Sequence, residues 1–271
     1  MENMDLIIVI AIFALALHRE LGELRTLSLR SNNDRMALKI AVGLMMLCLV
    51  IGGIDRFQQW FEYTFQTHVF FINGWLNSIP YNDLSIYFNY PSEVLVDTFR
   101  AIYNYGFYVP FFGLLIRAVA KRDFRALSLL AFGTFAFHYL VHFPFYTLTQ
   151  GHQVWMVKGE FPPLFRTISP LNHVFPSMHT SISVTYLLLA WKQPNKLIRV
   201  LYSIFCPLVI FATFYLRIHW TIDAIAGAAV GIAAVKFAQY ATRKQWLPAV
   251  INFLRGLWGT EKQREPVSLQ S

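Results

Sequence analysis

Two short stretches bring histidine together with residues that support acid–base or nucleophilic chemistry. Residues 172–179 read Asn-His-Val-Phe-Pro-Ser-Met-His, and residues 213–223 read Thr-Phe-Tyr-Leu-Arg-Ile-His-Trp-Thr-Ile-Asp. His219 and Asp223 are spaced i, i+4, which places them on one face of a helix. A carboxylate there fixes the imidazole tautomer and leaves the other ring nitrogen free as a nucleophile or base. A polar pair near a membrane interface, without chemistry, is the alternative.

The first stretch predicts the start of a helix. Ser177 follows Pro176 and is a typical N-cap, which places His179 in the first helical turn. The free N–H groups at such an end attract phosphate, and a histidine beside them can protonate a leaving oxygen. A capping serine with an incidental histidine explains this stretch alone, but the two stretches together favour chemistry.

The composition identifies a membrane protein. Of the 271 residues, 56% are hydrophobic and only 14% are charged, and the mean hydropathy is +0.43. An ordinary soluble domain has about 25% charged residues. A soluble fold of this length cannot bury so much apolar surface, so we do not expect a soluble enzyme, a disordered chain or a nucleic-acid-binding domain. The expected partner is the bilayer.

Seven apolar runs predict membrane-spanning helices, since backbone polar groups in lipid must be satisfied within each segment. The first and fifth runs are short, so six spans is the lower estimate. We expect an all-α, polytopic membrane helical bundle of six to seven transmembrane helices, forming one integral membrane domain over residues 1–259. The runs are Leu6–Leu17, Met36–Ile54, Ala101–Ala120, Ala126–Tyr146, Met178–Trp191, Leu197–Leu216 and Trp220–Phe237.

Basic residues are concentrated in alternate loops. Segments 19–39, 117–125, 192–199 and 236 onward hold 18 of the 23 Lys and Arg residues. One topology places all four segments on the same side, which the positive-inside rule identifies as cytoplasmic. We therefore expect an integral protein of the cell or inner membrane, with its N-terminus outside and its C-terminus in the cytoplasm.

The opposite, non-cytoplasmic face is where the two histidine stretches are expected to meet. Segment 55–99 is rich in acidic and aromatic residues and is expected to lie along this interface as an outer cap. The polar tail, residues 260–271, is expected to be disordered. The five remaining basic residues also fall on the outer side: Arg56, Arg100, Lys158, Arg166 and Arg217.

Together the two stretches resemble the motifs of the type 2 phosphatidic acid phosphatase superfamily, which includes vanadium haloperoxidases and lipid phosphotransferases. Its second motif usually reads Ser-Gly-His, matched here by Ser177 and His179, and its third motif ends in His-x-x-x-Asp, matched by His219 and Asp223. The resemblance covers residues 144–231. The Asn-x-x-Phe-Pro-Ser-x-His form is most similar to the branch that contains inositol phosphorylceramide synthase.

The chain departs from the superfamily pattern in three places. Met178 replaces the usual Gly, and Thr213 stands where the third motif has Arg, as is frequent in the same branch. The first motif, Lys, six residues and Arg-Pro, does not occur. Lys158 and Arg166 come close to it, but seven residues separate them and Thr167 follows.

The resemblance implies transfer through a phosphohistidine, with no cofactor and no metal. His219 would attack the phosphorus of a lipid phosphate or phosphodiester, Asp223 would orient it, and His179 would protonate the departing alcohol. Cationic and hydroxyl groups would then offset the phosphate charge. The expected phosphate-binding residues are Ser177, Arg217, Arg166 and Lys158, and the expected substrate contacts are His142, His173 and Asn172.

Hydrolysis of a lipid phosphate is the first expectation, and head-group transfer is the alternative, because both begin with the same phosphoenzyme. His138 and His142 are also spaced i, i+4, but a core role is favoured over metal binding. A zinc site built from the two stretches would leave Ser177 unexplained, and a serine hydrolase would need Gly-x-Ser-x-Gly. A seven-span transporter or receptor would place its polar residues at mid-membrane rather than at one face.

Overall fold

A computed structural model describes residues 2–84, 92–159 and 172–257 of the chain. Helices make up 78% of the described residues. Strand among the described residues is confined to β1 (Phe70–Phe71) and β2 (Thr149–Gln150), which pair in parallel with Phe70 opposite Thr149. The all-α fold class is therefore confirmed.

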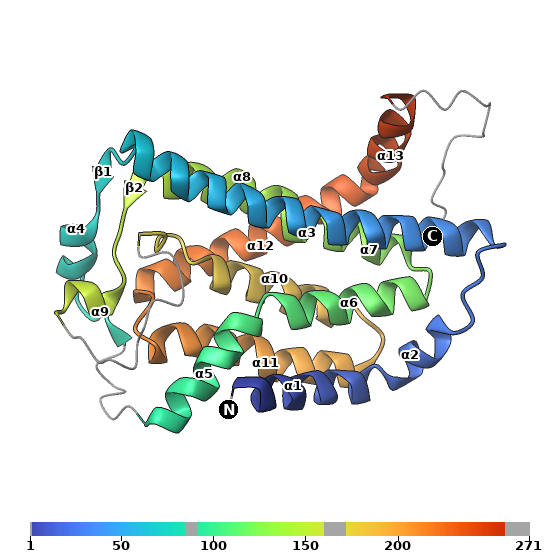
Figure 1. Ribbon diagram of the computed structural model, residues 1–271, viewed down its shortest axis with the longest axis horizontal. Coiled ribbons are helices and arrows are strands. Elements are labelled where there is room, and N and C mark those ends of the chain that lie inside the picture. Colours follow the sequence, from blue (N-terminus) through green and yellow to red (C-terminus); the bar gives the residue numbers. More distant parts are fainter. Residues whose placement is uncertain (1, 85–91, 160–171, 258–271) are drawn as a thin grey trace.

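The main helices run side by side along the long axis of the molecule (Figure 1). β1, β2, α4 and α9 lie together at one end, and α2 lies toward the other. The helices are α1 (Glu2–Ala16), α2 (His18–Leu24), α3 (Asn32–Phe65), α4 (Asn73–Ser78), α5 (Glu93–Tyr105), α6 (Tyr108–Ala120), α7 (Phe124–Ala131), the π-helix η2 (Phe132–Ala136), α8 (Phe137–Leu148), α9 (Val154–Val157), α10 (Met178–Trp191), α11 (Lys196–Tyr215), α12 (Thr221–Arg243) and α13 (Trp246–Leu257).

Four of the described helical segments are long and apolar enough to cross a membrane: α3, the continuous segment Phe124–Leu148, α11 and α12. All seven expected spans are helical, but α1, α6 and α10 have 13 to 15 residues each. These three are shorter than the roughly 20 residues that cross a hydrocarbon core perpendicularly. The fold is thus an integral helical membrane bundle that combines long and short helices.

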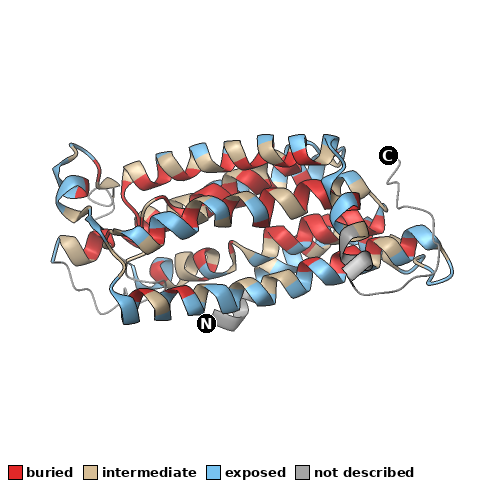
Figure 2. Cartoon of the chain, turned by 90° about the horizontal axis from the view of Figure 1, so that it is seen from above, coloured by how far each residue is buried: buried red, intermediate tan, exposed pale blue. Residues whose placement is uncertain are grey.

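The outward faces of the long helices are apolar. Buried residues face the spaces between helices, and exposed ones face outward (Figure 2). Leu49, Leu140 and Ile225 are 72%, 69% and 60% exposed. Soluble monomers rarely expose such extended apolar surface, so these side chains are suited to contact with lipid.

Three expected segments differ from the observed elements. α3 continues eleven residues beyond Ile54, so the first part of the expected cap at 55–99 is the end of a long helix. The run Ala101–Ala120 is two helices, because Pro110 has no N–H to donate to the carbonyl of Gly106 and is tolerated only in a first turn. The expected disordered tail, 260–271, lies outside the described residues.

α10 and α12 pack at unusually short range. A Cβ added at Gly227 would lie 2.4 Å from the carbonyl oxygen of Ser177, and one at Gly231 would lie 2.4 Å from that of Ser181. Both distances are below any real Cβ contact, so glycine is required at these positions. The close approach brings the start of α10 against the start of α12, where the two histidine stretches lie.

The end of the bundle away from β1 and β2 carries paired basic residues. Arg122 Nε donates to Asp34 Oδ1 at 2.7 Å, Lys121 bonds to Glu23, and Arg117 bonds to Gln193. These contacts join turns that the charge pattern placed on one side. We call this the basic end, and the end that holds the histidine stretches the histidine end.

Candidate active site

The turn between α11 and α12 positions His219. The N–H groups of Ile218 and His219 both donate to the carbonyl oxygen of Thr213, at 2.9 and 3.3 Å. Arg217 adopts the left-handed backbone region with φ of 54°, which reverses the chain sharply enough for α12 to start at Thr221. The ring of His219 is consequently buried, with 3% of its surface exposed.

Asp223 lies in the first turn of α12 and reaches back toward His219. Its Oδ2 accepts from the backbone N–H of Trp220 at 2.8 Å and lies 3.6 Å from His219 Nδ1. The expected arrangement on one helical face is wrong, because His219 precedes the N-cap residue, Trp220, and Asp223 lies in the first turn of the helix. Neither His219 Nδ1 nor Asp223 Oδ1 has a hydrogen-bond partner among the described residues, so the pair is poised to tighten when a ligand binds.

Ser177 and His179 open α10 as expected. Ser177 is the N-cap, and its hydroxyl oxygen accepts from the N–H of Thr180 at 3.3 Å. The N–H of Ser177 donates to the carbonyl oxygen of Asp223 at 3.0 Å. This backbone bond ties the two histidine stretches together directly.

Aromatic rings fix the orientation of His179. Tyr103 stacks on it at 3.7 Å between ring centroids, with 19° between the planes. Phe107 meets it edge-on at 4.1 Å. Both rings come from the junction of α5 and α6, so the break before Pro110 is what brings aromatic side chains against the histidine.

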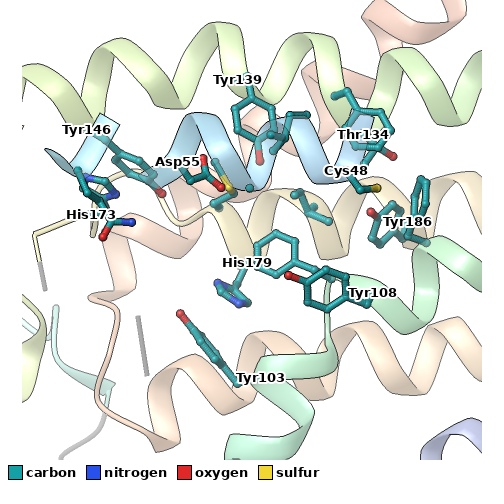
Figure 3. A pocket seen from close by; sticks show the side chains of 18 of the residues that line it. Cys48, Asp55, Tyr103, Tyr108, Thr134, Tyr139, Tyr146, His173, His179 and Tyr186 are labelled. Atoms are coloured by element: carbon teal, nitrogen blue, oxygen red, sulfur yellow. The ribbon is translucent and has the colours of Figure 1, made fainter. Parts of the chain in front are cut away.

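A cavity of about 290 Å³ contains both His179 and His219 in its wall. Most of the wall is apolar or aromatic, and it includes Phe107, Phe111 and Ile182. Figure 3 shows His179 beside Tyr103 and, at one end of the cavity, His173 beside Tyr146. The convergence of the two histidines on one site is therefore a feature of the fold.

The expected phosphate-binding cations are not in the cavity wall. No Lys or Arg is among the described residues that line it, whereas the carboxyl group of Asp55 is. Lys158 Nζ lies 5.9 Å from the ring centroid of Trp220, and Arg217 sits in the turn beside His219. Arg166 lies outside the described residues. Phosphate binding by these three residues stays a prediction.

The expected substrate contacts differ in position. His173 lines the cavity, whereas Asn172 Nδ2 lies 3.2 Å from His68 Nε2. His142 is fully buried with its Nδ1 2.9 Å from the carbonyl oxygen of His138 and its Nε2 3.4 Å from the hydroxyl of Ser181. These polar contacts fit the core role expected for the pair, and the described residues contain no cluster suited to metal binding.

Sequence reasoning missed Glu62 and the aromatic partners of His179. Glu62 was placed in the cap, but it is a buried residue of α3 whose Oε1 accepts from Gln58 Nε2 at 2.8 Å. The spacing i, i+4 of two polar residues in a helical continuation of an apolar run was the available signal. Tyr103 and Phe107 had no comparable signal, because aromatic residues are common throughout the segment.

Residues 124–247, from the start of α7 into α13, match the model of the PAP2 superfamily. This is the type 2 phosphatidic acid phosphatase superfamily that the two motifs resemble. Comparisons with curated proteins and with solved structures found no match. The match agrees with the resemblance at the level of the superfamily, and the narrower likeness to inositol phosphorylceramide synthase stays a prediction.

The matched region contains every motif residue of the site, including Ser177, His179, His219 and Asp223. Members of this superfamily are phosphatases or phosphotransferases. The match therefore supports an enzyme, a phosphoesterase that acts on phosphate-containing substrates.

Proposed function

We propose that this protein is a membrane phosphoesterase that cleaves a lipid phosphoester through a phosphohistidine on His219. Hydrolysis of a lipid phosphate is the first choice, and transfer of the phosphoryl head group to a second alcohol is the alternative. The observation that carries the proposal is the shared cavity, in whose wall His179 and His219 lie with Asp223 directly behind His219.

In the first step His219 Nε2 attacks phosphorus, because Nδ1 faces Asp223. The bond from phosphorus to the alcohol oxygen breaks, and His179 gives a proton to that oxygen. Asp223 stabilises the positive charge that develops on the His219 ring. In the second step an acceptor oxygen attacks phosphorus and releases His219. Such transfers depend mainly on positioning and on neutralisation of charge.

The start of α10 supports phosphate binding at this point. The first N–H groups of a helix have no partner within the helix and carry partial positive charge. The N–H of Thr180 is satisfied by Ser177 and that of Met178 faces the hydroxyl oxygen of Tyr146, which leaves the N–H of His179 for a phosphate oxygen. Arg217, Arg166 and Lys158 are the proposed additional cations.

The walls of the cavity favour a lipid substrate. Residues of α3, α6, α8 and α10 line it, and side chains such as Ile51, Phe111 and Phe135 suit an acyl or prenyl chain. We propose that the lipid enters sideways from the outer leaflet, with the histidine end on the non-cytoplasmic side and the basic end and C-terminus in the cytoplasm.

The test is a panel of short-chain lipid phosphates and phosphodiesters in detergent, with and without alcohol acceptors. We expect release of phosphate or exchange of the head group. We also expect a phosphoenzyme that is labile to acid and missing from His219→Ala. A transporter would release no phosphate, exchange no head group and trap no phosphohistidine. Faster turnover of a soluble phosphate than of its lipid equivalent would contradict lateral entry.

A further inference from the structure

A second histidine–carboxylate pair borders the same cavity. His173 Nε2 lies 2.7 Å from Glu62 Oε2, and the other oxygen of Glu62 accepts from Gln58 Nε2 at 2.8 Å. Gln58 Nε2 also donates to Thr147 Oγ1 at 3.0 Å. Glu62 is buried, with 2% of its surface exposed, so its carboxylate is fixed by hydrogen bonds rather than by water.

The ring of His173 is held in place by its neighbours. Tyr146 stacks on it at 4.6 Å with 11° between the planes, and the hydroxyl of Tyr146 donates to the carbonyl oxygen of Pro176 at 2.8 Å. With Nε2 engaged by Glu62, the other ring nitrogen, Nδ1, has no hydrogen bond among the described residues. Since His173 lines the cavity, Nδ1 is the nitrogen available to a ligand.

The second step of the proposed reaction needs a base for the acceptor. His179 is enclosed between Tyr103 and Phe107, where the apolar alcohol of the first step departs. His173 lies instead among polar groups, which include Glu62, Gln58 and, 3.8 Å from Glu62, the ring of His68. A polar acceptor, whether water or an alcohol, is better solvated on this side of the cavity.

We propose that His173, oriented by Glu62, is the base that activates the acceptor, an inference that rests on the proposed function. His173 Nδ1 takes the proton of the acceptor O–H, and the acceptor oxygen forms a bond to phosphorus. The bond from phosphorus to His219 Nε2 breaks, and its electron pair returns to the imidazole. Glu62 stabilises the imidazolium of His173 and is a positioning residue.

The test is a rapid-quench measurement of phosphoenzyme formation and breakdown in His173→Ala. We expect formation to be unchanged and breakdown to slow about a hundredfold, the usual contribution of a general base, so that phosphoenzyme accumulates. Added imidazole is expected to restore breakdown by filling the space between Glu62 and Tyr146. Unchanged breakdown, equal slowing of both steps, or no response to imidazole would each overturn the proposal.

Two further variants complete the test. Glu62→Gln keeps the shape of the pair and is expected to slow breakdown selectively, by less than His173→Ala. If His173→Ala does not fold, Glu62→Gln serves as the test. Slower breakdown of the phosphoenzyme with unchanged formation supports the proposal, and equal slowing of both steps contradicts it. His18→Gln is the control, since His18 is an exposed histidine of α2 that does not line the cavity, and it is expected to leave both rates unchanged. A wild-type protein without phosphoenzyme would overturn the proposed function itself, an outcome distinct from the others.

Discussion

The buried carboxylates at the two ends of the bundle have different partners. At the basic end Asp34 binds Arg122 and Glu23 binds Lys121. The hydrogen bond with Asp34 raises the pKa of Arg122 further above its ordinary value. At the histidine end, Asp223 faces His219 and Glu62 faces His173. Histidine, unlike arginine and lysine, is a residue type suited to acid–base catalysis.

The ion pairs of the basic end therefore stabilise the structure, whereas the histidine pairs are placed to take part in the proposed reaction. The cations of the basic end join three turns and hold charge on one side of the bundle. The histidine pairs border a cavity instead, and the His219–Asp223 pair keeps on each residue a buried polar atom that has no partner in the described part of the chain. Variants at the two ends are therefore expected to change different measurements.

Loss of His219 has the largest expected effect. His219→Ala removes the attacking nitrogen and is expected to reduce kcat about a thousandfold or more, with no phosphoenzyme and an unchanged melting temperature. Activity near that of the wild type would contradict the proposal that the reaction takes place at the histidine end.

Loss of His179 is expected to cost about a hundredfold or more in kcat, the contribution of a general acid. In His179→Gln the loss should shrink for a substrate whose leaving group needs no proton, such as a nitrophenyl phosphate ester. An equal loss for both substrates would indicate that His179 supports structure rather than proton transfer.

The Asp223→Asn variant is expected to lower kcat about tenfold to a hundredfold, because the amide still caps α12 but no longer stabilises the His219 imidazolium. KM for a lipid phosphate should change little. A full loss of folded protein in this variant would instead place the role of Asp223 in the helix cap, which Trp220 N–H to Oδ2 forms.

At the basic end we expect the reverse pattern. Arg122→Gln breaks the ion pair with Asp34 and should lower the free energy of unfolding slightly, seen as a lower melting temperature in detergent. The kcat of the folded protein should not change. A fall in kcat without a change in melting temperature would show that the two ends are coupled.

Lys121→Gln has the smallest expected effect. Lys121 and Glu23 are both exposed, and such pairs contribute little. The melting temperature and kcat should match those of the wild type within error. A shift as large as that of Arg122→Gln would show that exposure does not distinguish the two pairs.

The helices and the two motifs could be predicted from the sequence because hydrophobic runs and capping residues are local signals. Ser177 as N-cap and the meeting of His179 and His219 follow from such signals and from the charge pattern. The length of α3 could not be predicted, since acidic and aromatic residues after Ile54 suit both an interface and a helix end. The pairing of Glu62 with His173 spans 111 residues and depends on packing that no local pattern contains.

The π-helix η2 sets the rotational phase of everything that follows it in α8. Thr134, His138, His142 and Tyr146 recur every four residues, and a regular α-helix turns by about 40° more than a full circle over that interval. The wider turn at Phe132–Ala136 compensates part of this drift. Deleting one residue there would restore an ordinary helix but rotate His142 and Tyr146 by about 100°. The extra residue in this π-helical turn thus sets the direction in which Tyr146, the ring that stacks on His173, faces.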